Sequence, residues 1–276
     1  MKRMTEYTVP PKLYLLDVEG TVAPLTLTSE VLFPYARAHF EQFLWANEAE
    51  IEAHKSDGED SFAENDVWLD LFALALENRN DSDPAAPRIL PVPMERSTTD
   101  KAPRVISMSP REAIPRFLEY IDWLMDRDRK STALKSLQGK IWKAGFESGE
   151  LKGTLFEDVP AALQHWSANG RVAIYSSGSV EAQRLLFRHS IFGDLTGVIS
   201  DYFDTRSGPK QASASYAAIA VAMETEPQEI VFFSDIVKEL DAAREAGCQT
   251  RLVVREGNAP VDDPREHEIV ESFFRL

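Results

Sequence analysis

The first apolar run of the chain reads Lys12-Leu13-Tyr14-Leu15-Leu16 and ends at Asp17-Val18-Glu19-Gly20-Thr21. The run is short and shows no alternation of apolar and polar residues, which is typical of a strand buried on both faces of a parallel sheet. Similar runs that end in small polar residues before a helix recur over residues 171–179 and 229–235. These runs predict strands of one parallel sheet.

Helical patterns separate the apolar runs. They cover residues 159–169, 180–189, 213–223 and 236–246, and a further strand is predicted over residues 250–254. Strands that alternate with helices are typical of an α/β fold with a doubly wound, Rossmann-like parallel sheet. We predict this fold class for the core of the protein.

The alternation stops between residues 25 and 149. Apolar residues there recur at helical spacing, most clearly over residues 114–125 and 134–142, so we predict an inserted all-α cap domain over residues 25–149. The two flanking segments, residues 1–24 and 150–276, form the predicted α/β core.

A proline-rich stretch interrupts the predicted cap near residues 78–110. It also carries many Ser, Thr and Asp residues, and this composition is typical of loops. We predict a long loop there and no regular element.

The charge of the chain restricts its partners. Its 276 residues include 30 basic and 45 acidic ones, which gives a net charge of −15. We therefore expect neither nucleic acid nor an anionic membrane as a partner. The partner that we expect is a small phosphorylated metabolite. To bind it, such an acidic protein must build positive potential locally, from a metal ion, a lysine and backbone N–H groups. We also expect a monomer.

The cysteine count and the absence of long apolar segments indicate a compartment. Cys248 is the single cysteine, so no disulfide can form within the chain, and a lone cysteine fits a reducing environment. The first apolar run stops at Asp17, and the sequence shows neither a secretory segment nor a membrane span. We expect a cytoplasmic protein.

Polar side chains follow the predicted strands, at the edge of the sheet where parallel strands end together. They are Asp17 and Glu19, then Ser176 and Ser177, then Lys210, and finally Asp235. A carboxylate such as Asp17 can attack phosphorus and form an aspartyl phosphate. Glu19 lies two residues on, on the same side of an extended loop, and could protonate the leaving group and then deprotonate water.

The other positions could bind a phosphate and a cation. Residues 176–179, Ser-Ser-Gly-Ser, lie between a predicted strand and a helix, where hydroxyl and N–H groups hold phosphate. Lys210 is predicted to open the next helix and could neutralise an anion. Asp235 with Asp17 could hold Mg²⁺ through hard oxygen ligands. Each motif alone is more often a turn or a helix cap, so their combination carries the prediction.

A wider set of motifs is typical of one family. It consists of residues 16–21, 31–35, 128–130, 137–139, 175–183 and 202–205, and of Ser234-Asp235 with residues 239–243. These motifs resemble the haloacid dehalogenase superfamily of phosphotransferases and, within it, the enolase-phosphatase family of methionine salvage. The resemblance runs from about residue 13 to residue 254, with a gap over the proline-rich loop. Lys140 departs from it, since the family often has His there.

The resemblance implies a bifunctional enzyme that converts 2,3-diketo-5-methylthiopentyl-1-phosphate to 1,2-dihydroxy-3-keto-5-methylthiopentene and phosphate. It implies magnesium at Asp17, at Glu19 through its backbone carbonyl, and at Asp235. Substrate contacts are implied for Ser176, Ser177 and Lys210, with Asp17, Glu19 and Lys210 as the catalytic residues. The helical insertion would be the cap that excludes water and supplies specificity.

Two alternative functions stay open on the residues alone. A general sugar-phosphate phosphatase would share every core residue and differ only in the cap and in its substrates. A phospho-receiver or other phosphate-binding module would also place acidic residues, a hydroxyl residue and a lysine around Mg²⁺. Receivers are much shorter, however, and lack a helical cap.

Overall fold

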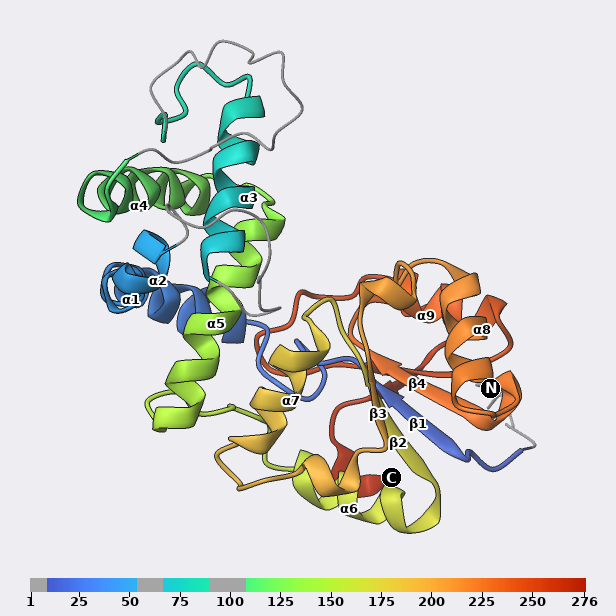
Figure 1. Ribbon diagram of the computed structural model, residues 1–276. Helices are drawn as coiled ribbons and strands as arrows, with labels where there is room; N and C mark the ends of the chain where they lie inside the picture. The colour runs from blue at the N-terminus through green and yellow to red at the C-terminus, as the bar shows by residue number, and fades with distance from the viewer. Residues whose placement is uncertain (1–8, 54–66, 90–107) are drawn as a thin grey trace. The chain divides into compact units, whose positions relative to one another are not determined.

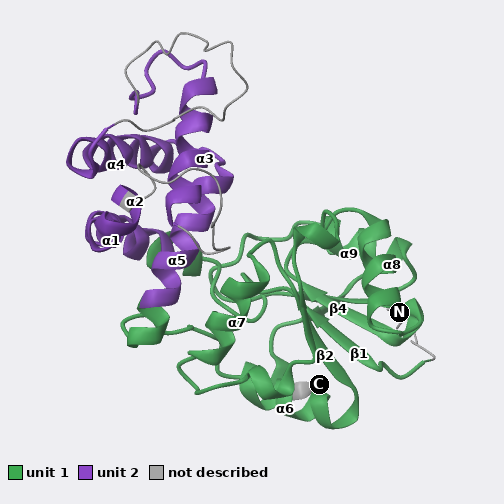
Figure 2. Ribbon diagram, viewed as in Figure 1, with its two compact units in different colours: residues 1–31, 145–276 green, residues 32–144 purple. Residues whose placement is uncertain are grey.

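The chain forms two compact units in a computed structural model, which describes residues 9–53, 67–89 and 108–276 (Figure 1). Unit 1 comprises residues 1–31 and 145–276, and unit 2 comprises residues 32–144 (Figure 2). The first and last segments of the chain therefore build one unit together, and the second unit is inserted between them.

Unit 1 is built on a parallel sheet, in which the described residues form six strands in the order β3-β2-β1-β4-β5-β6. The strands are β1 (Leu13–Leu16), β2 (Arg171–Tyr175), β3 (Asp201–Phe203), β4 (Ile230–Ser234), β5 (Gln249–Val253) and β6 (Glu268–Val270). Strands are added outward from β1 on one side and from β4 on the other, so the order reverses between β1 and β4. The doubly wound α/β fold predicted for the core is confirmed.

Helices cover both faces of this sheet (Figure 1). They are α6 (Val159–Asn169), α7 (Val180–Arg188), α8 (Ser213–Ala222) and α9 (Val237–Glu245). The side chains of β1 alternate between the faces: Leu13 and Leu15 join the apolar core that α8 and α9 share, whereas Tyr14 stacks on Trp166 of α6 with ring centroids 5.1 Å apart. Burial on both faces explains why the strand reads as an uninterrupted apolar run.

Two strands escaped prediction from the sequence, and both lie at edges of the sheet. β3 and β6 have three residues each. In β6 the Glu268 side chain is exposed and Ile269 is 51% exposed. Because an edge strand is covered less than a central one, it carries no continuous apolar run, and periodicity alone does not reveal it.

Unit 2 contains helices in its described parts. They are α1 (Phe33–Ala46), α2 (Glu48–Ala53), α3 (Val67–Asn80), α4 (Pro110–Asp126) and most of α5 (Thr132–Ser148), which continues into unit 1. The two segments with the clearest helical spacing in the sequence lie inside α4 and α5.

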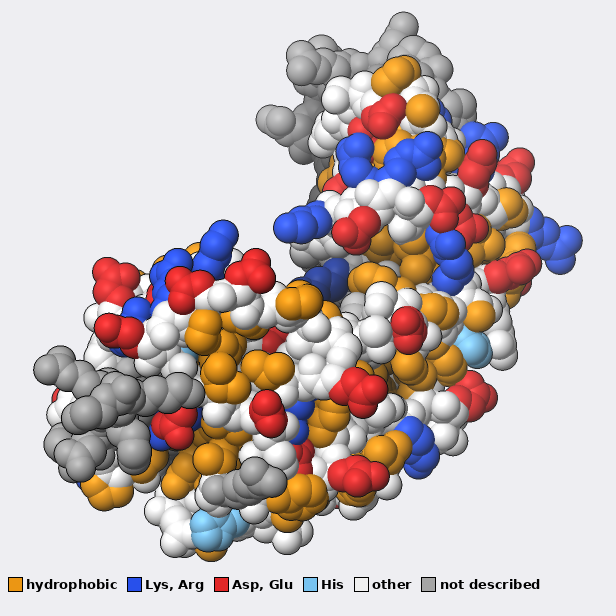
Figure 3. Space-filling model, turned by 180° about the vertical axis from the view of Figure 1, so that it is seen from behind, with side chains coloured by type: hydrophobic (Ala, Val, Ile, Leu, Met, Phe, Trp, Pro, Cys, Tyr) orange, Lys and Arg blue, Asp and Glu red, His pale blue; other side chains and the backbone are white. Residues whose placement is uncertain are grey.

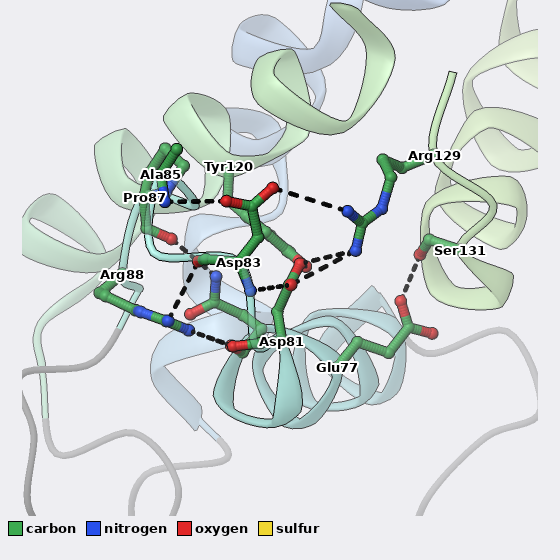
Figure 4. Close-up of polar contacts among 10 residues, drawn as sticks. Glu77, Asp81, Asp83, Ala85, Pro87, Arg88, Tyr120, Arg129 and Ser131 are labelled. Carbon is green, nitrogen blue, oxygen red and sulfur yellow. Dashed lines mark hydrogen bonds and ion pairs between the residues drawn. The ribbon is translucent and has the colours of Figure 1, made fainter. Parts of the chain in front are cut away.

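A buried carboxylate ties the end of α3 to the segment between α4 and α5 (Figure 4). Asp81 accepts hydrogen bonds from the Asp83 amide at 2.9 Å and from Arg129 Nη2 at 3.1 Å. The Asp83 amide, followed by the Arg129 charge, holds the pKa of Asp81 below its usual range. The neighbouring Glu77 accepts a hydrogen bond from the Ser131 hydroxyl at 2.5 Å. These contacts give structural roles to part of the motif over residues 128–130.

The units divide at 31/32 and 144/145, whereas the sequence suggested 24/25 and 149/150. Hydrogen bonds tie both linking segments to unit 1: the Thr28 amide donates to Glu19 Oε1 at 3.2 Å, and the Leu151 amide donates to the Gly145 carbonyl at 2.9 Å. The cap role of unit 2 stays a prediction.

Only part of the predicted proline-rich loop falls on described residues. Residues 81–89 form neither helix nor strand, and residues 90–107 lie outside the described residues. At the two ends of the predicted range, α3 extends to Asn80 and α4 begins at Pro110.

Charged side chains are mixed on the molecular surface. On the face drawn in Figure 3, acidic and basic side chains of the described residues are interspersed, and the basic ones gather in no broad patch. Among the described residues, no helix combines the length and the apolar character that a membrane span requires.

Candidate active site

The reversal point of the sheet brings together the chain segments that follow β1, β2 and β4. Leu16 pairs with Ile174 of β2 on one side and with Phe233 of β4 on the other. The Asp17 amide donates to the Phe233 carbonyl at 2.9 Å, which extends the ladder by one residue. Doubly wound sheets bind ligands in the crevice at this point, so Asp17 lies where the sequence predicts a site.

Lys210 is buried between two carboxylates. Its Nζ lies 2.6 Å from Asp17 Oδ1 and 2.7 Å from Glu239 Oε2, and its side chain is 9% exposed. Burial opposes the charge of Lys210, but Asp17 and Glu239 outweigh burial and raise the pKa of the lysine. Lys210 is therefore a fixed cation in contact with the predicted nucleophile.

Three hydroxyl groups hold the turn that carries Lys210. Tyr175 donates to the Gly208 carbonyl at 2.8 Å, Ser215 donates to the Pro209 carbonyl at 2.8 Å, and Tyr216 donates to the Lys210 carbonyl at 2.7 Å. Consecutive carbonyls are thus fixed from β2 and from α8. Sequence reasoning missed these hydroxyls, because Tyr175 and Tyr216 are fully buried and look like ordinary core residues.

The position of Lys210 differs from the predicted one in one respect. Helix α8 begins at Ser213, so Lys210 lies in the preceding turn and does not open the helix. The Ala212 amide donates to the Pro209 carbonyl at 3.0 Å, which closes this turn. The dipole of α8 therefore does not explain a lysine at this position. The contacts of Lys210 with Asp17 and Glu239 explain it.

Asp235 follows β4 and lies close enough to Asp17 for their charges to interact. Burial, followed by the negative charge of Asp17, raises the pKa of Asp235 to about 7. Gly20 packs directly on Asp235: its φ is +71°, and a Cβ added there would lie 2.5 Å from Asp235 Oδ2. Only glycine suits this conformation and this close approach.

The donor set fits a magnesium ion. Asp17 and Asp235 are hard oxygen ligands whose mutual repulsion a cation would relieve, and Mg²⁺ usually takes one or two carboxylates and completes its shell with other oxygens. Among the described residues, no group of three or more His, Cys, Asp or Glu side chains is arranged so that it could hold a metal ion by itself. A backbone carbonyl, water and phosphate would therefore supply the remaining ligands.

Glu239 and Ser234 belong to the site, although the sequence suggested no role for either. The Ser234 hydroxyl donates to Glu239 Oε2 at 3.0 Å and lies 3.4 Å from Asp17 Oδ2. Burial, followed by the charge of Asp17, raises the pKa of Glu239, and Lys210 opposes this change. The available signal was the place of Glu239 in the first turn of α9, shortly after Asp235.

Ser176 and Ser177 lie in the loop between β2 and α7. Ser176 is buried and its amide donates to the Phe203 carbonyl at 3.1 Å, whereas Ser177 is exposed. The N-cap of α7 is Ser179, whose hydroxyl accepts from the Ala182 amide at 3.2 Å. Capping therefore explains Ser179, and the Ser176 hydroxyl accepts a hydrogen bond from the Gly178 amide at 3.3 Å. The substrate contacts of Ser176 and Ser177 stay predictions.

The Glu19 side chain is directed to a backbone amide. Its Oε1 accepts the hydrogen bond from Thr28, and among the described residues no ion pair joins Glu19 to Lys210. The Gly20 amide donates to the Ala23 carbonyl at 2.8 Å, which fixes the peptide that carries the Glu19 carbonyl. The acid–base role of Glu19 stays a prediction.

Comparisons with known proteins show the family to which the chain belongs. Residues 11–247 match the family model of the haloacid dehalogenase-like hydrolases. A protein of Synechococcus elongatus named enolase-phosphatase E1 is 45% identical over 249 residues, which cover 90% of each chain. The chain belongs to the enolase-phosphatase family of these hydrolases. The resemblance predicted from the motifs is thereby confirmed, and so is the hydrolase class.

Two further comparisons extend over nearly the whole chain. The enolase-phosphatase E1 of Danio rerio is 37% identical over 268 residues, which cover 96% of this chain and 94% of the relative. The crystal structure of the UTR4 protein of Saccharomyces cerevisiae is 30% identical and matches 97% of this chain with a TM-score of 0.67. The match includes the helical unit as well as the sheet.

Proposed function

We propose that this enolase-phosphatase converts 2,3-diketo-5-methylthiopentyl-1-phosphate to 1,2-dihydroxy-3-keto-5-methylthiopentene and phosphate in methionine salvage. The observation that carries the proposal is the buried contact of Asp17 with Lys210 at the end of β1, beside Asp235. The name of the relatives, enolase-phosphatase E1, supports an enolisation followed by a dephosphorylation, and the family resemblance implies the substrate. The contact supports phosphoryl transfer as the second step.

Phosphoryl transfer uses Asp17 as the nucleophile. One carboxylate oxygen bonds to phosphorus while the bond from phosphorus to the substrate oxygen breaks, and Glu19 gives that oxygen a proton. Water then attacks the aspartyl phosphate, Glu19 takes up the proton from this water, and Asp17 is restored. The Val18 amide donates to Asp17 Oδ1 at 2.7 Å, so together with Lys210 it fixes the orientation of the carboxylate.

The remaining residues bind the phosphate and the cation. Lys210 offsets the negative charge of the transferring group, and Ser176 and Ser177 offer hydrogen-bonding groups beside the start of α7. Asp17, Asp235 and the carbonyl of Glu19 would hold Mg²⁺, which supplies positive charge for the phosphate oxygens when it is bound.

Enolisation precedes phosphoryl transfer and needs a base. Glu19 and Glu150 are candidate bases, and their spacing in the sequence does not decide between them. We propose that helical unit 2 acts as the cap that selects the methylthio substrate from other phosphorylated metabolites.

Removal of magnesium should abolish phosphate release. Ca²⁺ should not restore activity, because it takes a looser shell with more ligands and would misplace Asp17. The test is phosphate release from enzyme treated with EDTA, before and after Mg²⁺ or Ca²⁺ is added. Full turnover in excess EDTA would exclude the metal assignment.

The native substrate should give a transient enol phosphate before free phosphate appears. Stopped-flow ultraviolet absorbance follows the enol, and a coupled assay follows phosphate on the same time scale. The transient should accumulate when the second step is slowed. Phosphate released without a preceding enol, with equal turnover of simple sugar phosphates, would identify a general phosphatase instead. Phosphate retained on the protein after one turnover would indicate a receiver-like module.

A further inference from the structure

A turn that follows β5 contacts the loop after Asp17. The Asn258 amide donates to the Arg255 carbonyl at 3.1 Å, and Gly257 has a φ of +88°, as at the third position of a type II turn. Both ends of this turn reach the loop: Asn258 Nδ2 donates to the Gly20 carbonyl at 2.9 Å, and Arg255 Nε donates to the Thr21 carbonyl at 3.1 Å.

Arg255 is a rigid anchor for the turn. Its side chain is 6% exposed, and its guanidinium binds both oxygens of Asp158, at 2.7 and 3.0 Å. The guanidinium also lies 4.6 Å from the ring centroid of Phe156 and 4.4 Å from that of Phe273. Burial opposes ionisation of Asp158, but the hydrogen bonds from Arg255 hold its pKa below the usual range. Arg255 therefore cannot shift without breaking a buried ion pair.

The Asn258 side chain has one hydrogen-bond partner and one unsatisfied atom. Its Oδ1 is buried and makes no hydrogen bond among the described residues, whereas its Nδ2 binds Gly20. A buried amide oxygen without a partner disfavours folding. The unsatisfied oxygen gives no reason for an amide side chain at this position. The contact that explains the amide is therefore the hydrogen bond from Nδ2 to the Gly20 carbonyl. Gly20 also packs on Asp235.

The loop after Asp17 is held both from within and by this turn. Within the loop, the Gly20 amide donates to the Ala23 carbonyl at 2.8 Å, the Val22 and Ala23 amides donate to the Val18 carbonyl at 2.9 Å, and the Thr21 amide donates to the same carbonyl at 3.2 Å. None of these bonds uses the carbonyls of Gly20 and Thr21. Gly20 has no side chain to restrict its dihedral angles. The carbonyls of Gly20 and Thr21 are held by Asn258 and Arg255, so the turn fixes the two peptides that follow the Glu19 carbonyl.

We propose that Asn258, anchored through Arg255, is a positioning residue for the cation site. It fixes the peptide between Gly20 and Thr21, next to the peptide that carries the Glu19 carbonyl, and Gly20 packs on Asp235. Together with the hydrogen bond from the Gly20 amide to the Ala23 carbonyl, Asn258 thereby sets the Glu19 carbonyl relative to the Asp235 carboxylate. The inference rests on the proposed function, because that function assigns the cation to Asp17, Glu19 and Asp235.

The test compares two residues with amide side chains, Asn258 in the turn after β5 and Gln249 at the start of β5. Asn258→Ala and the bulkier Asn258→Leu remove the donor to Gly20. Gln249→Ala is the matched control, because Gln249 Nε2 donates to the carbonyls of Val9 and Gln228 at 2.8 Å, at the opposite end of β5. Mg²⁺ affinity is measured by calorimetry on metal-free protein, thermal unfolding by circular dichroism, and phosphate release as a function of Mg²⁺ concentration.

Both Asn258 variants should bind Mg²⁺ more weakly by about 10- to 100-fold, the range found when a residue that orients a metal ligand is replaced. Excess Mg²⁺ should restore most of their turnover. Gln249→Ala should unfold at a lower temperature and keep the wild-type Mg²⁺ affinity. Affinity within about twofold of wild type in the folded Asn258 variants, or an equal loss in Gln249→Ala, would overturn the inference. Wild-type protein that binds no Mg²⁺ would overturn the metal assignment together with it.

Discussion

Replacement of Asp17 by Asn should abolish phosphate release and leave the fold intact. Asparagine keeps an oxygen that can accept from the Val18 amide and from Lys210, which are 2.7 and 2.6 Å from Asp17 Oδ1. The amide is a poor nucleophile, however, so the aspartyl phosphate cannot form and the rate should fall by several orders of magnitude.

The measurement is phosphate release at saturating Mg²⁺, together with circular dichroism to show that the variant is folded. Asp201→Asn is the control, because Asp201 is a half-buried acid at the amino end of β3 and its Oδ1 accepts from the Tyr202 amide at 2.7 Å. This control should retain wild-type turnover. Substantial activity in a folded Asp17→Asn enzyme would exclude the covalent mechanism.

The core of the fold could be predicted from the sequence because central strands are buried on both faces. β1 is apolar along its whole length and β4 is apolar from Ile230 to Phe233, and this requirement leaves an unambiguous run in the sequence. β3 and β6 are short edge strands, and their neighbours in space decide whether they pair. Such pairing depends on tertiary contacts that no local pattern records.

The candidate site also has residues that the sequence predicts and residues whose role only the fold shows. Asp17 and Asp235 could be predicted because each directly follows a central strand, and parallel strands bring their ends together. The role of Glu239 could not be predicted, because its contact with Lys210 depends on how α9 packs beside the turn before α8. The hydroxyl of Tyr216 is a further case: only the fold shows that a core side chain also holds a backbone carbonyl.

Lys210→Met should reduce turnover by about 10²- to 10³-fold, the scale seen when one preorganised electrostatic contact is removed from an active site. Methionine keeps the apolar stem but leaves Asp17 and Glu239 without their shared cation. The transferring phosphate would then face uncompensated negative charge, so kcat should fall more than KM rises. Lys238→Met is the control, because Lys238 is an exposed residue of α9 next to Glu239.

Loss of the cation should also destabilise the fold, by as much as about 3–5 kcal/mol if both carboxylates stay ionised. Glu239 already has a raised pKa through burial and the charge of Asp17, and removal of Lys210 would raise it further. A carboxyl with a folded pKa above its unfolded value binds protons on folding, so the destabilisation should shrink as pH falls through that folded pKa. Urea unfolding of Lys210→Met and wild type at several pH values measures this difference. A wild-type rate, or a stability difference that grows as pH falls, would show that Lys210 is not the counter-ion of this site.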